Sequence, residues 1–126
     1  IDARVRFLGF RDDVADLIAA ADAFSLSSVW EGVPLAAQEA VLLGTPVVAT
    51  AVGGMDELVT DGVSGRLVPR DDPAALAAAL QEVLGSDELR RSFAEKALRN
   101  LESNFSTEEM TERLSTFYRG VVASRR

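Results

Sequence analysis

Short apolar runs, each closed by glycine, proline or aspartate, follow one another through the first half of the chain. The runs that are rich in β-branched and aromatic residues predict strands, at residues 5–9, 22–27, 46–50 and 66–68. Apolar positions three or four apart predict helices, at residues 14–20, 34–43 and 56–59. Strands that alternate with helices form parallel sheets, so we expect an α/β fold with a Rossmann-like parallel sheet of about four strands.

The second half of the chain is patterned only as helices. Apolar residues at helical spacing extend over residues 73–84, 87–102 and from 107 onward. Each segment follows a residue that can accept a hydrogen bond from the first helical turn, namely Asp72, Ser86 and Ser106. No linker, repeat or low-complexity run interrupts the pattern. We therefore expect residues 1–126 to form a single domain with helical cover and a helical C-terminal tail.

The junction at residues 30–40 carries the candidate chemistry, because it leads from an apolar strand into an apolar helix. Pro34 suits the first position of the helix, and Gly32 lets a ligand approach the backbone closely. The free N–H groups and the positive dipole end of such a helix start attract anions. Glu31 lies just before this point, and Glu39 lies inside the helix, where its side chain leans back toward the same end. Carboxylates accept hydrogen bonds from hydroxyls, so the combination predicts a site for a sugar nucleotide.

Composition narrows the chemistry further. The chain has no histidine and no cysteine, which excludes Ser-His and Cys-His nucleophile pairs, disulfides, and metal sites built on those residues. The remaining acids form no metal-ligand motif, so we expect neither a metal nor a cofactor. The net charge of −7 argues against a nucleic-acid surface. No apolar run approaches the roughly 20 residues of a membrane span and no secretory leader is evident, so we expect no transmembrane segment and a cytoplasmic location.

A series of short motifs resembles, in order and in spacing, the family-4 retaining glycosyltransferases, which are enzymes of the two-Rossmann-domain GT-B type. The motifs are Phe7-Leu8-Gly9, Ala21-Asp22-Ala23, Ser28-x-x-Glu31-Gly32, Glu39-Ala40, Gly44-x-Pro46-Val47-Val48-Ala49, Gly53-Gly54-x-x-Glu57 and Asp61-Gly62-x-x-Gly65. Such enzymes move a sugar from a nucleoside diphosphate sugar to an acceptor hydroxyl and keep the anomeric configuration. The resemblance covers nearly the whole chain and implies that it is part of a donor-binding domain.

The resemblance also implies a role for each matched position. Glu31 is similar to the carboxylate that contacts the hydroxyls of the donor sugar, which makes it the candidate catalytic residue. Glu39 is similar to the carboxylate that holds the ribose diol. The backbone N–H groups of Gly32, Val33 and Leu35 would face the diphosphate or the sugar.

Two further loops belong to the expected donor site. Gly9, Phe10 and Arg11 would lie against the nucleobase. Gly53 and Gly54 follow the third predicted strand, at the sheet edge where ligands bind in parallel α/β folds. The nucleoside diphosphate sugar is the expected partner, as substrate rather than as cofactor.

Two departures from the family pattern bear on what the chain can do. Val33-Pro34 stands where the family usually has an aromatic and a small residue, a change that still suits a helix start. The family's donor domain also begins with a βα segment bearing an Arg and a Lys that neutralise the leaving diphosphate, and the matched motifs start after it. We therefore expect a fragment, the later part of a C-terminal donor-binding domain with the N-terminal acceptor domain absent. Such a fragment would expose domain-packing surface and could self-associate.

Several positions keep a second interpretation. Glu31 also fits a solvated loop acid, and Arg11 also fits a solvated cation. Glu39 has apolar neighbours in sequence, so we expect it to be buried and satisfied by a structural partner or by a ligand hydroxyl. Trp30 is expected to pack at the rim of the pocket, and the glycine pair at residues 53–54 fits a plain turn as well as a binding loop.

Two other functions remain open at this point. The first is a non-catalytic α/β binding or structural module whose site is no longer used. The second is a nucleotide-sugar epimerase of similar architecture, although such sites usually depend on histidine. The motifs do not define the nucleobase, the sugar or the acceptor. We expect the isolated chain to bind donor weakly and to transfer no sugar.

Overall fold

A computed structural model describes residues 3–124, in which three parallel strands form one sheet. Their order in the sheet is β1 (Phe24–Leu26), β2 (Val47–Thr50) and β3 (Arg66–Val68). Phe24 pairs with Val47, and Val48 pairs with Arg66, so β2 lies between the other two strands. All four residues of β2 are buried, as expected for a central strand covered on both faces.

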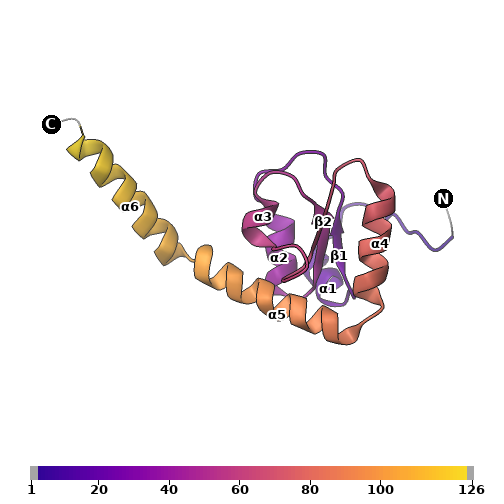
Figure 1. Cartoon of the computed structure of the whole chain (residues 1–126). Helices are drawn as coiled ribbons and strands as arrows, with labels where there is room; N and C mark the ends of the chain where they lie inside the picture. Colours follow the sequence, from indigo (N-terminus) through magenta and orange to yellow (C-terminus); the bar gives the residue numbers. More distant parts are fainter. Residues whose placement is uncertain (1–2, 125–126) are drawn as a thin grey trace.

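Helices cover the two faces of the sheet (Figure 1). They are α1 (Val14–Ala19), α2 (Leu35–Leu42), α3 (Met55–Leu58), α4 (Pro73–Leu84), α5 (Asp87–Asn104) and α6 (Thr107–Ala123). Helices α2 and α3 lie on one side of β2, and α4 lies on the other. The predicted α/β class, with a parallel sheet, helical cover and a helical C-terminal tail, is confirmed.

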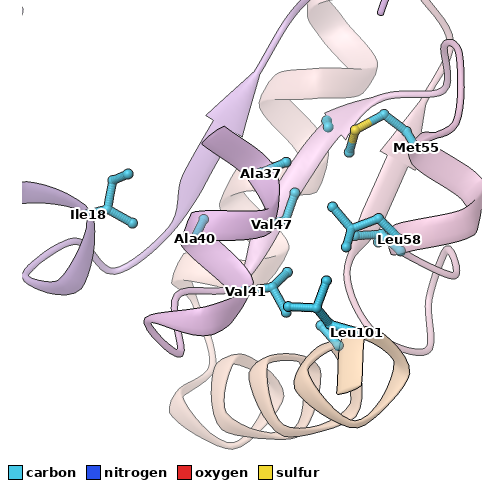
Figure 2. Packing of buried hydrophobic residues seen from close by; sticks show 11 residues of the cluster. Ile18, Ala37, Ala40, Val41, Val47, Met55, Leu58 and Leu101 are labelled. Carbon is cyan, nitrogen blue, oxygen red and sulfur yellow. The ribbon is translucent and has the colours of Figure 1, made fainter. Parts of the chain in front are cut away.

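Two apolar clusters hold these layers together. The first lies between the sheet and helices α2, α3 and α5 (Figure 2), and its members include Ala37, Ala40, Val41, Val47, Ala49, Met55, Leu58 and Leu101. The second lies between the sheet and α4, and its members are Val48, Val68, Ala79, Val83 and Phe93. Adjacent residues of β2 enter opposite clusters because side chains alternate across a strand. Helix α5 contributes to both clusters, so it fastens the two layers to each other.

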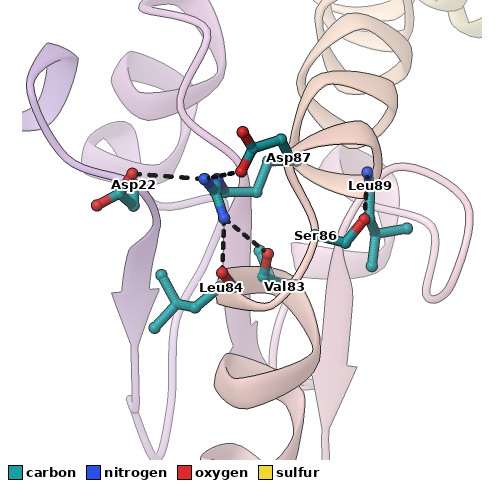
Figure 3. A network of polar contacts seen from close by, with 7 residues as sticks. Asp22, Val83, Leu84, Ser86, Asp87 and Leu89 are labelled. Atoms are coloured by element: carbon teal, nitrogen blue, oxygen red, sulfur yellow. Dashed lines mark hydrogen bonds and ion pairs between the residues drawn. The ribbon is translucent and has the colours of Figure 1, made fainter.

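The turn between α4 and α5 is fixed by the guanidinium of Arg90. Its Nη1 donates to the carbonyl of Leu84 at 2.7 Å, and its Nη2 donates to Asp87 at 2.5 Å. An ion pair at 3.7 Å reaches Asp22 just before β1, as Figure 3 shows. The positive charge of Arg90 at the Leu84 carbonyl satisfies an acceptor that the end of α4 leaves without a partner inside the helix. The helical second half of the chain is thereby attached to the sheet.

Helix α6 projects away from the rest of the molecule (Figure 1). None of its residues is buried, and its large apolar side chains are exposed. They are Met110, Leu114, Phe117, Tyr118, Val121 and Val122. Within residues 3–124, no helix combines the length and apolar character needed to cross a membrane.

One predicted strand does not form. Residues 5–9 make no strand, and the side chains of Val5, Phe7 and Leu8 are largely exposed. A strand needs a hydrogen-bonded neighbour, and in the described residues β1 pairs with β2 alone, so its other edge is free. The β-rich sequence of residues 5–9 is therefore not sufficient for strand formation in this chain, and the sheet has three strands instead of about four.

Candidate functional site

The predicted site lies where the parallel strands end. The end of β1 leads into the loop that carries Glu31, and the end of β2 leads into the loop that carries Gly53 and Gly54. Because β1 and β2 are parallel and paired, these loops emerge at the same edge of the sheet. The structure therefore brings together two of the three loops that the sequence singled out.

Two hydrogen bonds connect Glu31 to the end of β2. The hydroxyl of Ser28 donates to Glu31 Oε1 at 2.6 Å. The hydroxyl of Thr50 donates to the carbonyl of Ser28 at 2.6 Å. Thr50 is buried at the last position of β2, whereas Glu31 is half-buried. The carboxylate of Glu31 is thus fixed by Ser28 instead of being freely solvated.

The glycine pair packs against the backbone of the Glu31 loop. The N–H of Gly54 donates to the carbonyl of Gly32 at 2.7 Å. A Cβ at Gly53 would lie 1.9 Å from the carbonyl oxygen of Glu31, and the φ of Gly53 is +57°. Only glycine combines this close approach with a left-handed backbone at low cost. Gly53 and Gly54 therefore pack directly against the backbone of the Glu31 loop.

The start of α2 leaves backbone donors free. Within residues 3–124, the N–H groups of Gly32, Val33 and Leu35 have no hydrogen-bond acceptor, and no side chain caps the helix. Pro34 is the N-cap, with φ −69° and ψ 125°, so the helix begins at Leu35 and not at Pro34 as predicted. Free N–H groups at a helix start form a place where an anion binds well.

Glu39 does not lie where the sequence placed it. The residue is exposed, and its carboxylate has no hydrogen-bond or ion-pair partner among residues 3–124. Helix α2 buries Ala37, Ala40 and Val41, and Glu39 lies on a different face. The expected burial is therefore wrong, and with it the argument that a partner must satisfy the carboxylate. Glu39 lies about one turn inside the helix, which begins at Leu35, four residues after Glu31.

The segment expected at the nucleobase is exposed. Gly9 has a left-handed φ of +66°, and the side chain of Phe10 is 96% exposed. Arg11 is held by Asp13, to which its Nε and Nη2 donate at 2.6 and 2.5 Å. This bond raises the pKa of Arg11 and lowers the pKa of Asp13. No hydrogen bond or ion pair among the described residues joins Gly9, Phe10 or Arg11 to the Glu31 loop.

The pairing with Arg11 also changes the start of α1. Asp13 occupies the N-cap position of α1, but its side chain makes no capping hydrogen bond. The carboxylate binds the guanidinium instead.

Trp30 also differs from the sequence-based expectation, because its side chain is 83% exposed and does not pack at a pocket rim.

Two cavities bear on the location of the site. One of about 260 Å³ lies beside the end of the sheet and is lined by Ser27, Thr50, Asp71, Asp72, Pro73 and Leu76. A larger one of about 540 Å³ lies at the junction of α5 and α6, lined by Glu57, Asn104, Phe105, Met110, Arg113 and Leu114. Neither cavity is lined by Glu31, Glu39 or the backbone donors at the start of α2. Across residues 3–124, no group of three or more acidic side chains could hold a metal ion.

Comparison with known proteins identifies the class. Residues 1–86 match the family model described as glycosyl transferases group 1, and the chain belongs to this family. It is 34% identical to the N-acetyl-alpha-D-glucosaminyl L-malate synthase of Bacillus anthracis over 97% of the chain and 32% of that protein. It is 41% identical to the D-inositol 3-phosphate glycosyltransferase of Salinispora tropica over 100% of the chain and 26% of that protein. The predicted family membership is confirmed, and the epimerase alternative has no support.

Solved structures give the same class of protein as the sequence comparisons. The chain matches the crystal structure of HepE from Anabaena in complex with UDP with a TM-score of 0.80 and 33% identity, over 90% of the chain and 32% of that protein. The complex of HepE with UDP-glucose gives a TM-score of 0.79 at 32% identity, over 91% of the chain and 33% of that protein. The chain thus spans about a third or less of the relatives that it matches.

Proposed function

We propose that residues 1–126 act as one unit, the later part of the donor-binding domain of a retaining glycosyltransferase. The complete enzyme would move a sugar from a nucleoside diphosphate sugar to an acceptor hydroxyl. The observation that carries the proposal is the junction between β1 and α2. There a fixed carboxylate, Glu31, stands beside three N–H groups at the start of a helix that have no acceptor in the described part of the chain.

Each part of this junction suits one part of a sugar nucleotide. The N–H groups of Gly32, Val33 and Leu35 would donate to the diphosphate, and Pro34 has no N–H to offer. Glu31 would accept hydrogen bonds from hydroxyls of the donor sugar. The exposed Glu39 is free to accept from the two hydroxyls of the ribose. Donor groups directed at a leaving diphosphate stabilise the charge that develops in the transition state.

The nucleotide proposed for this site is UDP. Its support is that HepE, which matches the chain over nine-tenths of its length, is described in complex with UDP and with UDP-glucose. The role of Gly9, Phe10 and Arg11 against the nucleobase remains a prediction. Glycine pair 53–54 would act by shaping the backbone of the Glu31 loop.

Further partners follow from the same proposal. The acceptor would bind on another domain of the complete enzyme, and the exposed apolar face of α6 is a surface of the kind that domains cover. In the isolated chain the same face would allow self-association. A cytoplasmic location also stays a prediction.

Calorimetric titration of the chain with UDP, GDP and ADP tests the proposal. We expect weak binding of UDP and weaker binding of the other two. Glu39→Gln is expected to reduce UDP affinity roughly ten-fold, because hydrogen bonds to a charged group contribute about 1.5–3 kcal/mol. Glu88→Gln, a change of another exposed helical acid, serves as the control.

Two outcomes would contradict the proposal. Absence of heat with all three nucleotides would favour a structural module whose site is not used. Sugar transfer by the chain alone would contradict the view that it is only part of the catalytic machinery.

A further inference from the structure

The carboxylate of Glu31 is held by a short relay of hydroxyl groups that starts in the sheet. Thr50 is 5% exposed and ends the central strand, so its position is set by the core. Its hydroxyl donates to the carbonyl of Ser28 at 2.6 Å, and the hydroxyl of Ser28 donates to Glu31 Oε1 at 2.6 Å. The relay therefore passes from a rigid strand, through one loop residue, to the proposed sugar-binding carboxylate.

The relay leaves the other carboxylate oxygen unused. A carboxylate offers about four acceptor positions on two oxygens, and Ser28 occupies one of those on Oε1. Among residues 3–124, Oε2 has no hydrogen-bond or ion-pair partner. The bond from Ser28 thus selects one orientation of the side chain and keeps Oε2 free for a ligand.

The backbone of the same loop is held independently. Gly54 binds the carbonyl of Gly32, and Gly53 lies directly against the carbonyl of Glu31. Removing the hydroxyl of Ser28 should therefore free the side chain of Glu31 without releasing the loop. A half-buried carboxylate that loses this bond can turn to water, so little stability depends on it.

We propose that Ser28 is a positioning residue for Glu31, and that Thr50 positions Ser28. The proposal rests on the proposed function, because Glu31 is assigned to the sugar of the donor. Ser28 itself would not contact the nucleotide. Its effect should appear in the part of the affinity that comes from the sugar, and not in the part that comes from UDP.

The first test needs no ligand. Scalar couplings of the Glu31 β-protons, measured by NMR on the unliganded chain, should report a single χ1 rotamer in the wild type. Ser28→Ala should give averaged couplings, and Ser28→Thr, which keeps the hydroxyl, should restore the single rotamer. Ser25→Ala, a change of an exposed serine in β1, is the matched control. Averaged couplings in the wild type would overturn the proposal, whether or not nucleotides bind.

The second test separates sugar from nucleotide. The fluorescence of Trp30, the single tryptophan and an exposed neighbour of Glu31, is followed during titration with UDP and with UDP-glucose. Ser28→Ala should weaken UDP-glucose roughly ten-fold and leave UDP within about two-fold, as expected for loss of one charge-assisted hydrogen bond. Thr50→Val should reproduce the effect in part, and Thr50→Ser should not.

The outcomes distinguish the two claims. If UDP and UDP-glucose both fail to bind the wild type, the proposed function is contradicted, and the couplings alone decide whether Ser28 orients Glu31. If both ligands bind and Ser28→Ala weakens them equally or not at all, the positioning role is overturned while the proposed function stands.

Discussion

A Cβ placed on Gly53 would stand 1.9 Å from the carbonyl oxygen of Glu31. The two residues lie 22 positions apart, and their contact joins the loop after β2 to the loop after β1. The position of Glu31 therefore depends on a glycine in another loop.

Gly53→Ala should destabilise the chain by about 2–5 kcal/mol, the sum of a left-handed backbone and of overpacking against a carbonyl. Gly32→Ala is the matched control, because a Cβ there would meet nothing within 4 Å, and it should change stability by less than about 0.5 kcal/mol. Urea unfolding followed by circular dichroism measures both. Equal stability of the two variants would contradict the contact.

The side chain of Asn100 should be a second anchor of the fold. Its Nδ2 donates to the carbonyls of Glu57 and Leu58 at 2.8 and 2.9 Å, at the end of α3. Asn100→Ala should cost about 1–3 kcal/mol, because the part-buried carbonyl of Leu58 and the exposed carbonyl of Glu57 lose their donor. Lys96→Ala, an exposed position one turn earlier on α5, should be neutral or slightly stabilising, since alanine favours a helix. Thermal unfolding of the two variants provides the comparison.

The bond between Arg11 and Asp13 should be visible in a pH titration. The guanidinium lowers the pKa of Asp13, so Asp13 should titrate below the ordinary value of about 3.9. A lowered folded-state pKa contributes stability that is present above the unfolded pKa and is lost as pH falls through the folded pKa. Arg11→Gln should return Asp13 to its ordinary pKa, as measured by NMR of the carboxyl carbon. An unchanged Asp13 pKa in this variant would show that the bond does not persist in solution.

Helix α6 should make the isolated chain associate. Met110, Leu114, Phe117 and Val121 follow one another at intervals of four, three and four residues, and each is exposed. This spacing gives one apolar seam, of the kind that pairs helices. Sedimentation equilibrium should show dimers of the wild type that Leu114→Gln and Phe117→Gln abolish, while Glu112→Gln keeps them. A wild type that stays monomeric at NMR concentrations would contradict the prediction.

The sequence predicted the parts of the fold that local chemistry controls. Asp72, Ser86 and Ser106 accept the capping hydrogen bonds expected of them, from Ala75, Leu89 and Glu109. Gly44, the residue after the predicted helix at residues 34–43, has a φ of +76° and ends α2. These features depend on residues close by in the sequence, so the sequence pattern is sufficient to predict them.

The predictions that are wrong concern features that depend on contacts with residues distant in the sequence. Residues 5–9 have the composition of a strand, but among the described residues they pair with neither free edge of the three-stranded sheet, so composition alone does not form the strand. Helix α2 is apolar on nearly all sides, with Leu35 and Leu42 exposed and Ala37 buried, so periodicity did not identify its inner face. For this reason the predicted burial of Glu39 is wrong. The relay from Thr50 to Ser28 was missed for the same reason, since nothing in the sequence indicates that these residues meet.

The most direct test of the proposed site is a map of backbone amide shifts during titration of the chain with UDP-glucose. We expect the largest shifts at Gly32, Val33, Leu35, Gly53 and Gly54, with smaller changes on α5 and α6. Shifts confined to the cavity at the α5–α6 junction, or no shifts at saturating ligand, would contradict the assignment of the donor site to the Glu31 loop.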